Sequence, residues 1–412
     1  MKQVSLLIIF LTLFACKQEK AYVPENKIKD DVMFLADDKL EGRQTGSQGG
    51  EAAGNYIAER FKALGLEPKG TDGYFQSFTF TPKKDPHSQA QFTETSTDST
   101  ITAKNVLGYI NNNAPQTIVI GAHYDHLGYN EYGGSLYRGE EKQIHNGADD
   151  NASGVAVMLN LAAKLKNQDK GNNYLFMSFS GEEMGLLGSN YFVKHATIPV
   201  DSINYMLNMD MVGRLKADST LAVYGTGTSP VFKQVINANN DGRFKLIEKE
   251  SGVGPSDHTS FYLNDVPVLH FFTGQHEDYH KPSDDYDKLN YEGMNEISDY
   301  IFDIITDLDD NGELTFRKTK NESDNAPRFK VTLGVVPDYM FDGKGMRIDG
   351  VSEDKPAQKA GLKKGDIVIQ LGDIEVKDMM SYMKALSKFE KGNTTTVTVQ
   401  REGKEVKAEV TF

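Results

Sequence analysis

The sequence predicts an α/β fold with a mixed sheet whose central strands are parallel. Several short apolar runs are typical of strands buried on both faces. These runs are residues 117–122, 174–180, 205–212 and 266–272. Residues 155–165 and 294–305 carry apolar stripes at helical spacing, and a further helix is expected before Gly65. Strands that alternate with helices in this way favour a sheet with a mainly parallel centre.

The composition is that of a folded protein with two or three domains. The chain has 412 residues, 38% of them apolar, which is enough to bury a large core. Its formal charge of −14 and its lack of a long basic run exclude a nucleic-acid surface. Residues 311–328 are polar and lack apolar periodicity. They predict a linker between a domain at 25–310 and a smaller one at 329–412.

The first residues predict export. Lys2 precedes an apolar run at 4–15 that is too short to span a membrane, so residues 1–15 are expected to be a signal peptide. Cys16 is the only cysteine, and its position resembles the lipid-modified residue of bacterial lipoproteins. We expect a lipid on Cys16, a tether at 16–24, and a location on the periplasmic side or surface of a bacterial membrane. The alternative is an ordinary signal peptide with a chance cysteine.

Acidic and histidine residues follow the predicted strands. In open α/β sheets, ligand sites collect at the carboxyl ends of strands. His123, Glu182, Glu183 and Asp210 each lie at or just beyond such an end. We therefore expect a functional site at this edge of the sheet.

The motif AHYDHLG supplies the first candidate. His123 is a candidate metal ligand, and Asp125 lies two residues on, on the same side of an extended backbone. A carboxylate that accepts the other ring N–H would orient the imidazole, so Asp125 is expected to act behind His123. The role of His126 is left open. A lone His-x-Asp pair is also common in structural hydrogen bonding.

The motif NGADDNASG places two acids between small residues, just before a helix. Carboxylates are costly to bury without a cation or hydrogen-bond donors. Asp150 is therefore expected to bridge two metal ions. The alternative is a helix-capping turn in which Asp149, Asn151 or Ser153 accepts hydrogen bonds from free N–H groups.

The motif SGEEMGLLGS has adjacent glutamates directly after a strand. If Glu183 binds a metal, Glu182 stays free to take a proton from a nearby water. The alternative is a solvated helix start, stabilised by the helix dipole.

Two more motifs complete the candidate set. In NMDMVGR, Asp210 follows an apolar strand, where an unpaired charge would be destabilising. In HEDYHKPSDD, His280 is chosen as a ligand, with His276 and Asp278 in reserve. In PSDHTSF, a serine triad is rejected, because neighbours in sequence rarely align as a relay, although Ser256 is a candidate for the pocket wall.

These residues together predict a two-metal hydrolase. A histidine and a carboxylate for each metal, with one bridging carboxylate, account for five ligands. The expected ligands are His123, Asp150, Glu183, Asp210 and His280.

The six motifs HYDH, GADDNASG, GEEMGLLGS, NMDMVG, PSDHTSF and DYHKPSD together resemble peptidase family M28, the zinc aminopeptidases. The resemblance covers residues 25–310 and includes LADDKLEGRQTGSQGG. It implies a phosphorylase/hydrolase-like three-layer sandwich that binds two zinc ions and removes residues from peptides with a free N-terminus. It also implies that Asp150 bridges the metals, that Glu182 is the general base, and that Asp125 supports His123. The other four ligands would divide between the two ions.

Two features depart from the family pattern. Some relatives have a tyrosine shortly before the SDH sequence that helps to hold the reacting carbonyl, but residues 252–254 are Gly-Val-Gly here. The group that stabilises the oxyanion is therefore unassigned. Many relatives carry an inserted domain before HYDH, and residues 75–115 are too few for one. The loop at 128–144 is expected to form the rim of the site instead.

Residues 329–412 resemble a PDZ domain, through LGVV from Leu333 and KPAQKAGLKKGDIVIQLGDIEV from Lys355. The resemblance implies a C-terminal peptide or protein ligand, held by N–H groups near Gly334 and added as a strand. A helical apolar stripe is expected to form the groove wall. It consists of Met379, Tyr382, Met383 and Leu386. The alternative is a purely structural lid or a dimer contact.

Three other functions compete with an aminopeptidase. A glutaminyl cyclase on the same scaffold would use one zinc, and the bridging Asp150 counts against it. A carboxypeptidase would need a cation for the substrate carboxylate, for which Arg214 is a candidate. A binding protein with an inactive site would require a broken ligand set, whereas this set is complete.

Overall fold

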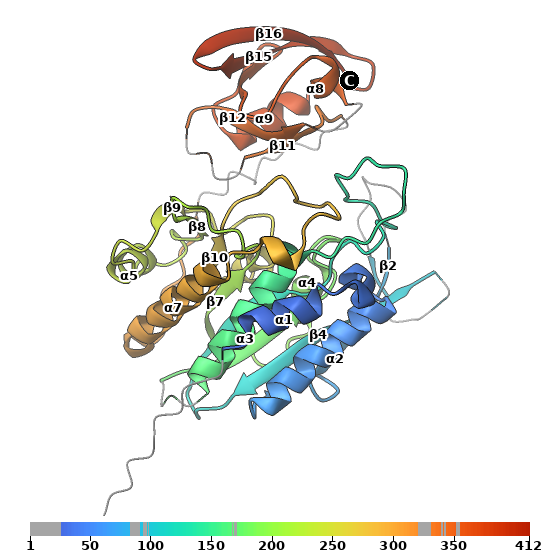
Figure 1. Ribbon diagram of the computed structural model, residues 1–412. Helices are drawn as coiled ribbons and strands as arrows, with labels where there is room; N and C mark the ends of the chain where they lie inside the picture. Colours follow the sequence, from blue (N-terminus) through green and yellow to red (C-terminus); the bar gives the residue numbers. More distant parts are fainter. Residues whose placement is uncertain are drawn as a thin grey trace, which may run out of the picture.

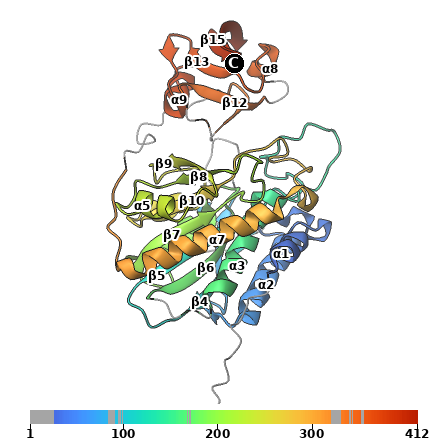
Figure 2. The ribbon, with the colours of Figure 1, turned by 60° about the vertical axis from the view of Figure 1, so that its left-hand side comes forward.

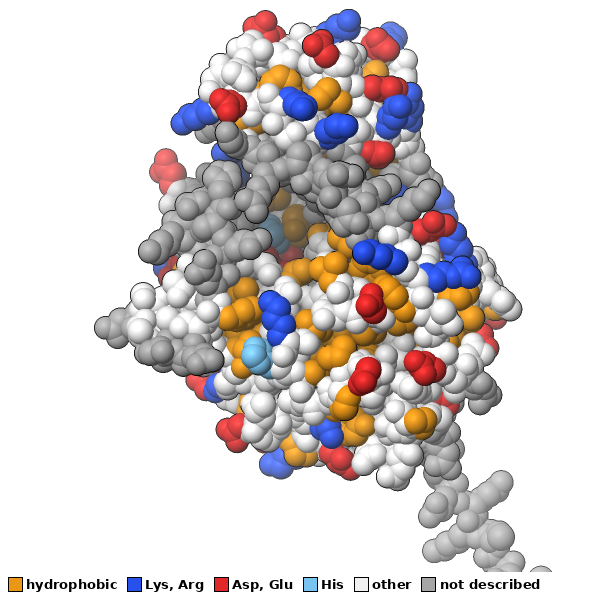
Figure 3. Space-filling model, turned by 180° about the vertical axis from the view of Figure 1, so that it is seen from behind, with side chains coloured by type: hydrophobic (Ala, Val, Ile, Leu, Met, Phe, Trp, Pro, Cys, Tyr) orange, Lys and Arg blue, Asp and Glu red, His pale blue; other side chains and the backbone are white. Residues whose placement is uncertain are grey.

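The computed structural model describes residues 26–412 except 83–90, 94–96, 98, 167, 169–170, 320–330, 339–340, 342 and 352–354 (Figure 1). The predicted signal peptide and tether, with Cys16, lie outside the described residues. Within the described part of the chain, no helix combines the length and the apolar character needed to cross a membrane. A large α/β domain lies below a smaller β-rich domain, and the surface is hollowed between the two (Figures 1 and 3).

The large domain is built on a sheet of ten described strands. In spatial order these are β3 (Gln91–Phe92), β2 (Phe75–Thr81), β4 (Ile101–Ile110), β6 (Asn173–Phe179), β5 (Thr117–His123), β7 (Ile203–Met209), β10 (Val268–Phe272), β8 (Thr220–Tyr224) and β9 (Lys245–Lys249), with β1 (Glu67–Pro68) paired to β4. Strands β6, β5, β7 and β10 run parallel to their neighbours in this group, whereas β2 to β4, β4 to β6 and β10 to β8 pair antiparallel. The prediction of a mixed, centrally parallel sheet is confirmed.

Helices cover both faces of the sheet, which makes three layers, and Figure 2 shows the helices over the nearer face. One face is covered by α1 (Ile28–Leu35), α2 (Gln48–Ala63), α3 (Gly154–Leu165), α5 (Phe232–Ala238) and α7 (Tyr291–Leu308). The other face is covered by α4 (Leu187–Lys194) and α6 (His258–Tyr262). The four central strands are apolar because they are buried on both sides, so their sequences do not alternate.

The N-terminal segment contains two helices with a turn between them. Helix α1 is followed by a 3₁₀ turn at Asp38–Arg43, in which Glu41 and Gly42 have positive φ. The Ser47 hydroxyl then accepts a hydrogen bond from the Gly50 N–H and caps α2. The helix expected before Gly65 is present: α2 ends two residues before this glycine, whose φ is +72°.

The small domain has its own sheet and its own core. Its strands are β11 (Val335–Pro337), β12 (Met346–Val351), β13 (Ile367–Leu371), β14 (Ile374–Glu375), β15 (Thr394–Arg401) and β16 (Lys404–Thr411), and its helices are α8 (Pro356–Lys359) and α9 (Met379–Leu386). Tyr382 and Leu386 of α9 are buried in this core, so they are not free to wall a groove as expected. The Gly334 N–H already donates to the hydroxyl of Thr332.

The first part of the predicted linker packs on the large domain. The N–H of Leu314 donates to the Asn204 side chain at 2.7 Å, and the Arg317 N–H donates to the carbonyl of Thr228 at 2.7 Å. Leu314 itself is buried in the main core. The remainder of the predicted linker, from residue 320, falls in a gap of the description.

Gly49 provides a test of the close packing between α2 and the turn before it. A Cβ at this position would lie 1.7 Å from the carbonyl oxygen of Leu40. Gly→Ala normally stabilises a helix by about 0.5–1 kcal/mol, but overpacking costs about 1–3 kcal/mol. We expect Gly49→Ala to lower the free energy of unfolding measured in urea. Asn55→Ala, at an exposed position of the same helix, is the control and should be neutral or stabilising.

Candidate metal centre

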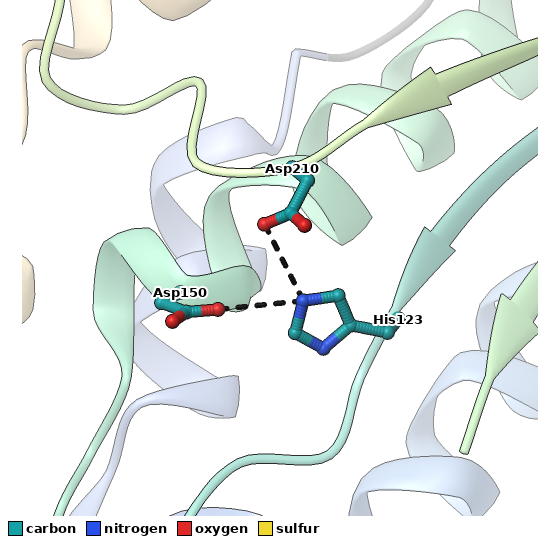
Figure 4. A group of neighbouring side chains, drawn as sticks. All are labelled: His123, Asp150 and Asp210. Atoms are coloured by element: carbon teal, nitrogen blue, oxygen red, sulfur yellow. Dashed lines mark hydrogen bonds and ion pairs between the residues drawn. The ribbon is translucent and has the colours of Figure 1, made fainter. Parts of the chain in front are cut away.

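The candidate site lies where β5, β6 and β7 end, beside the turn that leads into α3. His123 is the last residue of β5, and Asp210 directly follows β7. The Nε2 atom of His123 lies 3.3 Å from Oδ1 of Asp150 and 3.4 Å from Oδ1 of Asp210 (Figure 4). These three side chains come from three segments of the chain and converge on one point, so they form a group that suits a metal ion.

A second group shares Asp150 with the first. The Nε2 atom of His280 lies 3.2 Å from Oδ2 of Asp150 and 3.3 Å from Oε2 of Glu183. His126 joins this group, with its Nδ1 atom 2.7 Å from Oε1 of Glu183 and 4.0 Å from Oδ2 of Asp150. The two oxygens of Asp150 therefore face different histidines, one on each side.

All five residues expected as ligands lie together in this cluster, whereas the two reserve residues do not. His126, whose role the sequence left open, lies in the cluster, and its HYDH motif alone carries no signal that separates it from His123. The reserve residues lie elsewhere: His276 Nε2 is 3.1 Å from the Asp149 carboxylate, and Asp278 pairs with Arg214 and Lys288.

The expected role of the Asp125 carboxylate needs correction. The Nδ1 atom of His123 lies 3.1 Å from the backbone carbonyl of Asp125, whereas the carboxylate is 3.8 Å away. A carbonyl can only accept, so Nδ1 carries an N–H, and Nε2 is the ring nitrogen that faces the acids. The carboxylate instead accepts from the hydroxyl of Thr45 at 2.8 Å and from the N–H of Glu182 at 3.2 Å.

The turn that carries Asp150 is stabilised by hydrogen bonds to a residue outside the turn. The carboxylate of Asp284 accepts hydrogen bonds from the N–H groups of Asp149 and Asp150, at 3.0 to 3.1 Å. The capping alternative is true for Asn151, whose side chain accepts from the N–H of Gly154 at 3.0 Å. Capping and site geometry thus belong to different residues of one turn.

Arg43 fixes the base of the site. Its fully buried guanidinium donates to the carbonyls of Tyr124 at 2.8 Å, Asn146 at 2.6 Å and Gly147 at 2.9 Å, and also to Leu35 at 2.6 Å. Burial lowers the pKa of Arg43 to about 10, against the opposing effect of nearby acids, so it stays charged at neutral pH. Sequence reasoning missed this residue, which sits in a polar segment that gives no sign of burial.

The electrostatics separate the two adjacent glutamates. Burial raises the pKa of Glu183, but His280 outweighs it, and the pKa falls to about 2. Burial raises the pKa of Glu182 well above its ordinary value; His123 opposes this, whereas Asp210 and Glu183 add to it. Glu183 is therefore held as a carboxylate, and Glu182 has the higher affinity for a proton.

The acids also act on the histidines. Burial lowers the pKa of His123, but Asp210 and Glu182 outweigh it and raise the pKa well above its ordinary value. The pKa of His280 is raised in the same way, by Glu183 and Asp150 against burial. The cluster thus attracts positive charge strongly.

The cluster opens into a small pocket of about 130 Å³. Its lining includes Asp150, Glu182, Glu183 and Asp210, together with the apolar or aromatic side chains of Met211, Tyr224, Phe272 and Tyr279. Neither tyrosine was singled out from the sequence, although Tyr279 directly precedes His280 in the motif DYHKPSD. The Ser256 hydroxyl accepts from Asn208 at 2.8 Å and is not among the lining residues, so it does not serve as a wall.

Two family models match the chain. Residues 105–305 match the model of peptidase family M28, and residues 312–412 match the model of the PDZ domain. The first match contains all the residues of the candidate centre except Arg43 and Thr45.

The chain is similar to several known proteins. It is 28% identical over 215 residues to the aminopeptidase YwaD of Bacillus subtilis (strain 168), covering 48% of this chain but only 43% of that protein. The fold is like that of an aminopeptidase from Aneurinibacillus sp. strain AM-1, with a TM-score of 0.54 at 18% identity, over 72% of this chain and 95% of that one. It is also like that of a Porphyromonas gingivalis glutaminyl cyclase, with a TM-score of 0.53 at 17% identity, over 68% and 97% of the chains.

Asp150→Asn tests the shared carboxylate. The exchange keeps the shape but removes the negative charge that faces both His123 and His280. We expect the affinity for zinc, measured by competition with a chromogenic chelator, to fall by at least about tenfold. Asp287→Asn, an exposed acid in the same domain, is the control and should bind zinc as the native protein does. Equal affinities in the two variants would contradict a metal centre at Asp150.

Arg43→Met tests the buried cation. It removes a donor from each of four carbonyls, and we expect the free energy of unfolding to fall by on the order of 3–5 kcal/mol. Lys39→Met removes a charge from the same turn but at an exposed position, so it is the matched control. Urea unfolding at equilibrium measures both, and similar stabilities would show that Arg43 does not hold the site together.

Proposed function

We propose that this chain, which carries a domain of peptidase family M28 followed by a PDZ domain, is a zinc-dependent aminopeptidase with two metal ions in its centre. The chain spans less than half of the length of the Bacillus relative, so the activity is argued from the site itself. The observation that carries it is the position of Asp150, whose two oxygens face separate groups of histidine and carboxylate.

The donor set fits zinc. Imidazole nitrogens and carboxylate oxygens are zinc ligands, and the first group offers three of them and the second four. His123, Asp150 and Asp210 would hold one ion; Asp150, Glu183 and His280 would hold the other, with His126 beside Glu183. Buried acids without enough cations are destabilising, and the one buried guanidinium nearby, Arg43, is occupied by carbonyls. Divalent ions would balance this charge.

Glu182 is the proposed general base. When bound, the zinc ions supply a Lewis acid that polarises the scissile carbonyl and lowers the pKa of a nearby water. The Glu182 carboxyl lines the same pocket and has the raised affinity for protons that a shuttle needs. It takes a proton from the attacking water and returns it to the leaving amine. The Asp125 carboxylate positions Glu182 through its backbone N–H.

The charge of the pocket favours an amino-terminal substrate. Its described lining contains four acids and no lysine or arginine, so no side-chain cation there is available to hold a substrate carboxylate. Arg214, the cation considered for a carboxypeptidase, is paired with Asp278 at 3.2 Å. Because a glutaminyl cyclase shares the fold, the reaction product has to distinguish the two activities. The lipid on Cys16 and the exported location stay predictions from the sequence.

Glu182→Gln tests the mechanism. The exchange removes the base but leaves the expected ligands, so kcat for an aminoacyl p-nitroanilide should fall by about 10²–10⁴-fold. Zinc content, measured by mass spectrometry, should stay the same as in the native protein. Glu59→Gln, at an exposed position of α2, is the control and should keep full activity.

The native protein should reject the same substrate when its α-amine is acetylated, and it should release no ammonia from peptides that begin with glutamine. Normal turnover in Glu182→Gln would remove Glu182 as base. Ammonia release without peptide cleavage would replace the aminopeptidase with a cyclase.

A further inference from the structure

A second and larger cleft lies between the two domains. It has a volume of about 580 Å³, within the range of ligand sites at domain interfaces. The large domain contributes the loops at 136–139 and 276–281, and the small domain contributes residues 349–351 and Lys364. The Lys249 ammonium donates to the carbonyl of Phe341 at 3.4 Å, which is a contact between the small domain and the end of β9.

The cleft adjoins the metal pocket. Tyr279 lines both, and the next residue, His280, is one of the histidines in the cluster. The metal pocket, at about 130 Å³, is smaller than the roughly 300 Å³ at which ligand pockets begin, so it holds one side chain and not a whole peptide. The rest of a bound peptide has to leave the pocket, and the cleft is the adjoining space.

The charges of the two spaces are opposite in character. The metal pocket is lined by acids, whereas the cleft carries three cations against the carboxylates of Glu277 and Asp349. Lys364 is neutralised by Asp349 at 3.0 Å. Arg138 and Lys281 contact only backbone carbonyls among the described residues, those of Ser135 and Glu277. Two cations in the cleft are therefore available to an anionic ligand.

We propose, on the basis of the proposed aminopeptidase activity, that this cleft holds the part of the substrate beyond the cleaved bond, and that Arg138 and Lys281 bind its C-terminal carboxylate. Lys281 directly follows His280, and adjacent Cα atoms lie about 3.8 Å apart, whereas an extended peptide advances about 3.3–3.6 Å per residue. A carboxylate bound by Lys281 therefore lies only a few residues beyond the cleaved bond. The substrates are then short peptides of about three to five residues. The small domain closes the far wall of this subsite.

The test compares matched substrates on the full-length enzyme. We expect kcat/KM for a tetrapeptide with a free carboxylate to exceed that for its C-terminal amide by about three- to tenfold, as for a partly exposed ion pair. In Arg138→Gln, Lys281→Gln and the double variant, this ratio should fall toward one. Lys142→Gln, on the same loop as Arg138 but paired with Glu131 and outside the cleft, is the control and should keep the native ratio.

The small domain is tested with Val351→Trp, which adds bulk to its side of the cleft. We expect KM to rise for the tetrapeptide more than for an aminoacyl p-nitroanilide, which ends at the metal pocket. Circular dichroism monitors folding. The inference would be overturned if kcat/KM of the native protein were equal for the tetrapeptide acid and its amide, or if the double variant kept the native ratio of the two. Cleavage of the p-nitroanilide would still support the aminopeptidase in either case. If the native, zinc-loaded protein cleaved neither the tetrapeptide nor the p-nitroanilide, the proposed function itself would be refuted.

Discussion

The rest of the structure depends on one buried cation. The Arg43 guanidinium bonds to carbonyls from the turn after β5 and from the loop before Asp150, and thereby joins two chain segments that are about a hundred residues away from it. Each segment carries part of the metal centre. A carboxylate cluster repels itself, and backbone carbonyls near it add further negative potential. A fixed guanidinium with several donors offsets both and also sets the distance between the segments.

Hydrogen bonds between neighbouring groups also position the acids of the cluster. The Asp150 carboxylate is not used to cap its own helix. The Asp284 carboxylate accepts hydrogen bonds from the N–H groups of the turn, and the Asn151 side chain caps α3. The Asp150 carboxylate is thereby left to face the histidines on its two sides. The Asp125 carboxylate likewise accepts from the Thr45 hydroxyl and the Glu182 N–H, which aligns the segment of Glu182 with the end of β5. The polar groups around the cluster form hydrogen bonds with one another. The negative charge that still needs a counter-charge is therefore concentrated on the acids at the centre of the cluster.

Much of this arrangement could be predicted because it follows from sheet topology. Parallel strands end at the same edge, so acids and histidines placed after apolar runs converge there, as His123 and Asp210 do. Three details could not be predicted. The contact of His126 with Glu183 depends on the bend of a loop, and the burial of Arg43 depends on carbonyls from distant segments. The orienting acceptor of His123 is a carbonyl, which side-chain patterns do not report.

The small domain follows different constraints. The helical stripe that includes Tyr382 and Leu386 was expected to face a ligand, yet a domain of this size needs such residues for its own core. What it adds to the larger domain is a wall, at the end of β12, opposite the loop that carries His280. In a chain with a net charge of −14, substrate anions are repelled in general, so the cations of Arg138 and Lys281, which line the same cleft from the large domain, confine their attraction to one place. A peptide whose two ends carry opposite charges then has a preferred direction: its ammonium points to the acids of the metal pocket and its carboxylate to the cleft.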